Sequence, residues 1–146
     1  MIWKDWLRDG RIENHAPSRE EVAAQRKAAE RSLADAALPG LSSEGRFQLT
    51  YGAALDLATT AVLASGHRVR SRVGHHQLTF EAAGVVLGVE AAGFVSYFDV
   101  CRRKRNVISY EGDEIGGDQA DELLREVTRF AGFVDAWLKE HHPMLV

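Results

Sequence analysis

Three polar residues, Arg105, Asn106 and Tyr110, are the sharpest candidates for catalysis or binding in this chain. Arg105 follows Cys101 by four residues, so helical spacing places its side chain on an apolar stripe. A guanidinium there requires acceptors, because burying an unpaired charge is very costly. Its planar fork also matches the oxygens of a phosphate. Two interpretations follow: a structural pair with a carboxylate such as Asp56, or a phosphate contact in a cleft between subunits.

Three histidines, His67, His75 and His76, form the second group. Adjacent histidines at the start of a helix point in different directions, whereas metal sites on helices favour spacings of three or four. We therefore predict no metal site. One of His75 and His76 is expected to cap or pack the helix start, with the other exposed. If the fold places His76 beside Arg105, His76 has a second interpretation: it is a catalytic base.

Basic side chains form the third group, in two short runs. Residues 66–110 hold seven basic and three acidic side chains, although the whole chain has a net charge of −3. Such segregation can steer a polyanion toward one face of a protein. Two structural roles are alternatives to binding a polyanion. Cations near the end of a helix complement its dipole, and Arg103 can form a surface pair with Asp99. The predicted nucleic-acid contacts are Arg68, Arg70, Arg72, Arg102, Arg103 and Lys104.

Length and composition limit the class of protein. A chain of 146 residues fits one domain with its own core, and the single cysteine, Cys101, excludes an intramolecular disulfide. The N-terminus has no signal-peptide pattern, and the apolar run 82–97 is interrupted by Glu90 and too short to span a membrane. The glycine-rich segment 112–117 lacks the Lys-Ser/Thr of a phosphate loop. We therefore expect a cytoplasmic protein without a cofactor.

Helical spacing of apolar residues organises most of the chain. Ser18 and Glu21 have the form of a capping box that starts a helix, which ends at residues 39–40. Further helices are expected over about 43–65, from about 75, over about 91–106, and from Asp118 to about 142. No segment alternates as a strand does, so no sheet is expected. The prediction is an all-α fold, in which residues 18–142 form an antiparallel up-and-down four-helix bundle and residues 1–17 form an arm or short helix packed on it.

Over roughly residues 18–140 the chain resembles the HEPN family. The resemblance rests on an ordered set of segments: Phe47-x3-Tyr51-x2-Ala54-Leu55-x2-Ala58, then Gly66-His67-Arg68 and Gly74-His75-His76, then Phe98-x3-Arg102-Arg103-Lys104-Arg105-Asn106-x3-Tyr110. It implies an up-and-down helical bundle that is usually dimeric. Many members are RNases of toxin–antitoxin, abortive-infection or other defence systems. Others accompany a nucleotidyltransferase partner, and some have no catalytic activity.

The catalytic motif of that family is an arginine followed, after four to six residues, by a histidine. Here Tyr110 follows Arg105 after four residues, and no histidine lies between His76 and His141. A phenol with a pKa near 10 is a poor general base at neutral pH. We therefore expect a homodimer that binds RNA or a nucleotide through Arg105, Asn106 and Tyr110, with weak or absent nuclease activity.

Two alternatives remain open from the sequence. One is a non-catalytic module that binds a protein partner through its helical faces. The other is an active, metal-independent RNase whose base is displaced to His75 or His76. The partners to be considered are thus a second copy of the chain, RNA or a nucleotide, and a nucleotidyltransferase.

Overall fold

Helices dominate the computed structural model, which describes residues 2–111 and 114–146, with the side chains of 108–111 left out of the description. This confirms the all-α class. The elements are α1 (Ile2–Arg8), β1 (Ile12–Asn14), α2 (Arg19–Ala36), α3 (Ser43–Ala64), β2 (His67–Val69), α4 (His75–Leu87), the 3-10 turn η1 (Val89–Ala91), α5 (Ala92–Glu111), α6 (Gly117–His141) and the 3-10 turn η2 (Pro143–Leu145).

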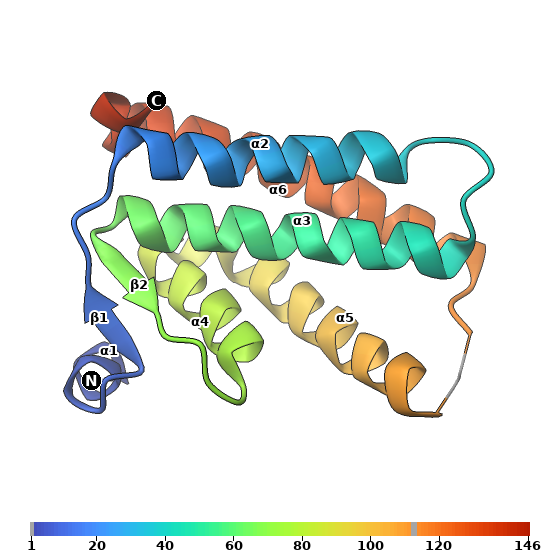
Figure 1. Ribbon diagram of the computed structural model, residues 1–146, viewed down its shortest axis with the longest axis horizontal. Helices are drawn as coiled ribbons and strands as arrows, with labels where there is room; N and C mark the ends of the chain where they lie inside the picture. The colour runs from blue at the N-terminus through green and yellow to red at the C-terminus, as the bar shows by residue number, and fades with distance from the viewer. Residues whose placement is uncertain (1, 112–113) are drawn as a thin grey trace.

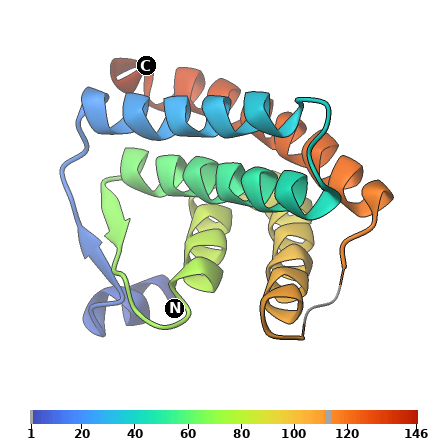
Figure 2. The ribbon, with the colours of Figure 1, turned by 45° about the vertical axis from the view of Figure 1, so that its right-hand side comes forward.

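Helix α3 lies at the centre of the molecule. It contacts α2 and α6, which run alongside it, and also α4 and α5, which cross on its other side (Figures 1 and 2). Small buried residues such as Ala54, Ala58 and Ala61 let these neighbours approach its backbone closely. The three long helices α2, α3 and α6 thus form one layer, and α4 and α5 form a second layer beneath it.

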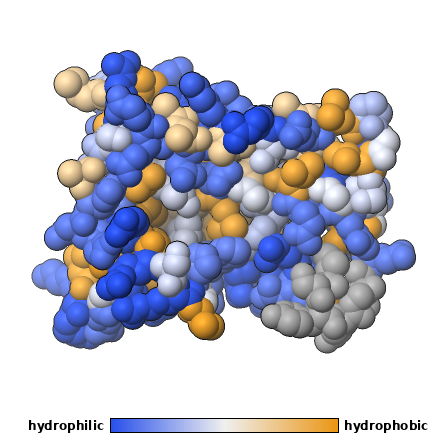
Figure 3. Space-filling view, in the orientation of Figure 1, coloured by the Kyte–Doolittle hydropathy of each residue, from blue (hydrophilic) through white to orange (hydrophobic). Residues whose placement is uncertain are grey.

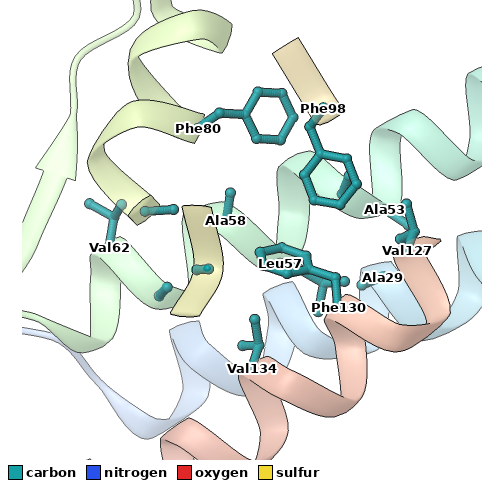
Figure 4. Close-up of a cluster of buried hydrophobic side chains, with 14 of the residues drawn as sticks. Ala29, Ala53, Leu57, Ala58, Val62, Phe80, Phe98, Val127, Phe130 and Val134 are labelled. Carbon is teal, nitrogen blue, oxygen red and sulfur yellow. The ribbon is translucent and has the colours of Figure 1, made fainter. Parts of the chain in front are cut away.

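A chain of aromatic rings joins the two layers through the core. Tyr51 of α3 lies 5.9 Å from Phe80 of α4 between ring centroids, and Phe80 lies 5.5 Å from Phe98 of α5. Phe98 in turn lies 5.0 Å from Phe130 of α6, and Figure 4 shows Phe80, Phe98 and Phe130 pointing into the same cluster. Such pairs add roughly 0.5–1.5 kcal/mol each beyond the burial of their apolar area.

A small antiparallel sheet links the N-terminal arm to the segment after α3. Ile12 pairs with Val69, and Asn14 pairs with His67. The expectation that the chain has no sheet was therefore wrong. Strands of three residues are too short to show a period-two pattern in the sequence, and the structure shows that Ile12 of β1 is fully buried. The arm also contributes Trp6, which is 4% exposed, to the core.

The first helix of the main body begins as the sequence predicts. The Ser18 side chain accepts a hydrogen bond from the backbone N–H of Glu21, and the Glu21 carboxylate accepts one from the N–H of Ser18. Helix α6 begins at Gly117, one residue before the expected start at Asp118, and its N-cap is Gly116.

The end of α5 differs more from expectation. The helix continues to Glu111 instead of ending near residue 106, so the basic run 102–105 lies within it and not in its last turn. The interpretation of these cations as complements of the helix dipole is therefore wrong, because that effect is confined to the last turn. Within residues 2–111 and 114–146, no helix combines the length and apolar character that crossing a membrane requires.

Candidate functional site: a histidine and arginine hollow

A hollow of about 330 Å³ lies between the start of α4 and the second half of α5. We call it the histidine–arginine hollow. Gly74, whose φ of +81° favours glycine, turns the chain from the loop after β2, residues 70–74, into α4 and so directs the first residues of that helix toward α5. The hollow is lined by Arg72, Val73, Gly74, His75, His76, Gln77, Arg102 and Asn106.

The two histidines differ in their surroundings. His75 is half-buried, and its Nδ1–H donates to the carbonyl oxygen of Arg72 at 2.9 Å, while its Nε2 has no hydrogen bond to any described residue. The ring of His76 lies 4.4 Å from that of His75. Burial lowers the pKa of His76, and the positive charges of His75, Arg105 and Arg102 lower it further. His76 is therefore a neutral imidazole at pH 7, able to accept a proton.

Arg105 points inward, onto α3, as its position on the apolar stripe predicts. Its Nε–H donates to Oε1 of Gln48 at 2.9 Å, and its guanidinium carbon lies 5.2 Å from the centroid of the Tyr51 ring. The proposed pairing with Asp56 is wrong, because Asp56 lies eight residues, about 12 Å, further along α3 than Gln48. Burial raises the pKa of Asp56, and the cation that acts on it is Arg31.

Arg105 thus lies beside the hollow rather than in its lining. Its charge acts on His76, and both side chains contact Tyr51, whose ring centroid lies 6.2 Å from that of His76. His76 and Arg105 thus contact the same tyrosine ring, and the interpretation of His76 as a catalytic base remains a proposal. Asn106 lines the hollow directly, whereas the side chain of Tyr110 lies outside the described residues.

On α5, the predicted basic residues divide between two surfaces. Arg102 lines the hollow, where its Nε lies 3.1 Å from Oδ1 of Asp99. Arg103 makes the expected pair with Asp99, at 3.0 Å. Arg103 and Lys104, however, line a different hollow, next to Ile115. The six predicted basic residues therefore do not form one patch.

Between α3 and α4, two of the three predicted arginines, Arg68 of β2 and Arg70 of the loop that follows it, pair with Glu13 of β1. Glu13 forms an ion pair with Arg68, and Arg70 Nε lies 3.8 Å from its carboxylate. The hydrogen bond from Arg68 is the main cause of the lowered pKa of Glu13. Arg72 continues past this pair and lines the hollow. Of the loop arginines, Arg72 is therefore the one placed to meet a ligand there.

Arg11 joins the same basic surface and was missed by sequence reasoning. It lines a narrow recess with Arg70, Arg72 and His75, and its carbonyl oxygen accepts the N–H of Arg70. The pairing of β1 with β2 brings these arginines together, and no sequence signal marks that pairing. Figure 3 shows mostly hydrophilic side chains over this part of the molecule, where α1, the two strands and the following loop lie.

Comparison with family models, curated proteins and solved structures gives no match to this chain. A proposal about function therefore rests on the residues that line the hollow and on their geometry. The hollow combines two guanidinium groups, two amides and two imidazoles within one opening. Guanidinium and amide groups hold phosphate oxygens, and neutral imidazoles exchange protons near neutral pH.

Proposed function

We propose that this protein binds RNA, with a phosphate of the backbone held in the histidine–arginine hollow by Arg72, Arg102 and Asn106. The observation that carries the proposal is the convergence of these three side chains from the loop before α4 and from α5 on one opening. Phosphate contacts from arginine supply most of the affinity of such proteins and make it sensitive to salt.

Charge outside the hollow supports the same ligand. Arg11 and Arg70 extend the basic surface beyond Arg72, so a strand seated in the hollow meets further cations along its backbone. Asp99 and Glu13 offset part of this charge, because each accepts ion pairs from two arginines. Binding is therefore expected to be moderate in affinity and to require several phosphates at once.

The family resemblance completes the proposal. We propose a HEPN-like protein whose helices form an antiparallel up-and-down four-helix bundle with an N-terminal arm, and which acts as a homodimer in a toxin–antitoxin or defence system. The order of the long helices α2, α3, α5 and α6 along the chain supports this assignment. A nucleotidyltransferase encoded beside this chain would be its partner. Light scattering after gel filtration tests the dimer, which requires twice the mass of one chain.

RNA binding is tested by the fluorescence anisotropy of a labelled single-stranded 20-mer at low and moderate salt. Arg72→Ala and Arg102→Ala are each expected to weaken binding about fivefold or more and to reduce the salt dependence by about one phosphate contact. Arg125→Ala is the matched control, because Arg125 is an exposed arginine on α6. Wild-type protein that binds no RNA would contradict the proposal and favour the protein–protein interaction module.

A second candidate function, metal-independent RNA cleavage, is favoured by one observation: neutral His76 lies in the same hollow as Arg102. In this reaction His76 takes the proton of a 2′-hydroxyl, whose oxygen attacks the adjacent phosphorus. The bond from phosphorus to the 5′-oxygen breaks, and that oxygen receives a proton from His75 in its protonated form. The products are a 2′,3′-cyclic phosphate and a 5′-hydroxyl, with no metal required.

Cleavage is tested with EDTA present, on a labelled RNA and on the same strand with 2′-deoxyribose at every position. His76→Ala is expected to abolish cleavage while RNA binding stays within about twofold, because the arginines supply the affinity. Cleavage that persists in His76→Ala would overturn this candidate. Binding without cleavage by the wild-type protein would leave the RNA-binding proposal intact.

A further inference from the structure

Two tryptophans and three histidines converge on a second hollow, of about 580 Å³, at one end of the molecule. We call it the aromatic pocket. The ends of α1, α3, α4 and α6 meet there with the start of β2, and Figure 1 shows these element ends gathered on the side of the two termini. The lining residues are Trp3, Ser65, His67, Val85, Val86, Leu87, Trp137, His141 and His142.

The two indoles are held in place without being fully buried. Trp3 contacts His67 edge to face, with 5.0 Å between ring centroids, and Trp137 packs against His142 at 4.9 Å. The side chain of Trp137 is half-buried and lines the pocket. Both tryptophans therefore present aromatic surface to the opening, and the buried Leu87 adds an apolar wall.

The chemistry of the lining selects an uncharged ligand. No lysine, arginine, aspartate or glutamate is among the lining residues in the part of the chain that the structure describes. A phosphate or carboxylate would find no fixed counter-charge there. One polar ring atom lies at the edge of the pocket: Nδ1 of His67 is hydrogen-bonded to Oγ of Ser65 at 3.1 Å, and its Nε2 has no hydrogen bond to any described residue.

The dimensions agree with a small flat molecule. Pockets for small ligands have volumes of roughly 300–1,000 Å³, mostly apolar walls and a few polar groups that fix orientation. Aromatic side chains stack on flat rings, and imidazole or indole nitrogens bond to the polar edge of such a ring. A nucleobase has both properties: two apolar faces and a rim of donors and acceptors.

We propose that the aromatic pocket binds a nucleobase, stacked against Trp137 and edged by His67 and His142. This site shares no residue with the histidine–arginine hollow and does not depend on the RNA proposal. The base has two sources, a free nucleoside or an unpaired base of an RNA strand. The ring chemistry is the same in both, and only the strand carries phosphates to the basic surface.

Adenosine is the probe for the site, and isothermal titration calorimetry measures its binding without relying on the fluorescence of the substituted tryptophan. Trp137→Leu is expected to weaken adenosine binding at least about tenfold, because stacking is lost. Trp137→Phe keeps a flat ring and is expected to stay within about threefold of wild type. His142→Ala, at the end of α6, provides a second variant that removes an edge contact without touching the core.

Arg102→Ala is the matched control, because it alters the histidine–arginine hollow alone. Unchanged adenosine affinity in this variant supports the proposal. Three outcomes would each overturn it. The first is loss of adenosine binding in Arg102→Ala, and the second is wild-type affinity in folded Trp137→Leu and His142→Ala. The third is that the wild-type protein does not bind adenosine. Circular dichroism establishes that each variant is folded.

An adenylate 10-mer then distinguishes the two sources. If the base belongs to RNA, the 10-mer binds more tightly than adenosine, and both Trp137→Leu and Arg102→Ala weaken it. If the ligand is a free nucleoside, the 10-mer gains nothing over adenosine. Failure of the RNA proposal appears separately, as 10-mer binding that is insensitive to Arg72→Ala and Arg102→Ala.

Discussion

The guanidinium of Arg105 lies over the ring of Tyr51, with its central carbon 5.2 Å from the ring centroid. This contact joins α5 to α3 directly beneath the histidine–arginine hollow, because Tyr51 also contacts His76. Tyr51 is 2% exposed, and burial raises its pKa to about 12. The phenol therefore stays protonated at neutral pH and acts here through its ring face.

The hydroxyl of Tyr51 has no hydrogen-bond partner among the described residues. Tyr51→Phe is therefore expected to leave the free energy of unfolding unchanged or to raise it by up to about 1 kcal/mol, since a buried unsatisfied group is costly. Tyr51→Leu loses the ring and its cation–π contact and should cost about 2 kcal/mol. Urea denaturation measures both. A loss of more than about 1 kcal/mol in Tyr51→Phe would mean that the hydroxyl does have a partner.

The protonation of His76 links stability to pH. Its pKa in the folded protein lies below that of the unfolded chain, chiefly because of burial. The unfolded state therefore binds more protons as the pH falls through about 6.5, and the folded state loses stability until the pH passes below the folded pKa. His76→Gln is expected to flatten the fall in unfolding free energy between pH 7.5 and pH 5.5.

A second histidine is expected to contribute independently to this dependence of the unfolding free energy on pH. Burial also lowers the pKa of His142, which directly follows α6 and lines the aromatic pocket. His142→Gln should flatten the profile separately, and the double variant should show the sum of the two effects. A wild-type profile that does not fall over this range would refute the assignment for both residues.

Two helical glycines should respond in opposite ways to alanine. Gly132 is exposed within α6, and a Cβ there meets nothing within 4 Å, so Gly132→Ala should stabilise the fold by about 0.5–1 kcal/mol. A Cβ on Gly84 would lie 3.0 Å from Cγ2 of Val95, where α4 and α5 cross closely. Gly84→Ala should therefore lose this gain and destabilise the protein, by about 1 kcal/mol. Thermal denaturation of the pair, compared with wild type, gives the sign of each.

The capping box at the start of α2 provides a test of local stability. Ser18→Ala removes the acceptor for the N–H of Glu21 and should cost about 1 kcal/mol. Ser18→Asp keeps an acceptor and should stay within a few tenths of a kcal/mol of wild type. Chemical denaturation distinguishes the two. Equal losses in both variants would show that the serine contributes through packing rather than through its hydrogen bond.

Features that depend on neighbouring residues were predictable from the sequence. Ser18 and Glu21 cap a helix from three residues apart, and the stripe containing Phe98 and Cys101 placed Arg105 inward because helical period alone decides that direction. Cys101 is buried as expected, and burial raises the pKa of its thiol to about 11.

Features that depend on how distant segments pack together were not predictable from the sequence. The partner of Arg105 is Gln48, and any of several polar residues along α3 had the right chemistry, so the correct one depended on where α5 crosses α3. Arg11 reaches the basic surface only through the pairing of two three-residue strands. His76 was named for its type, but its place in the hollow follows from the turn at Gly74.

The pairing of Ile12 with Val69 joins positions that are far apart in the chain. So short a pair of strands is expected to open more readily than the helices around α3. Its backbone amides should therefore exchange with deuterium earlier than those of α3. One such amide is the N–H that Arg70 donates to the carbonyl oxygen of Arg11. Trp3 precedes this pair of strands and lines the aromatic pocket. The rate at which the arm detaches would then govern how fast a ring enters or leaves that pocket.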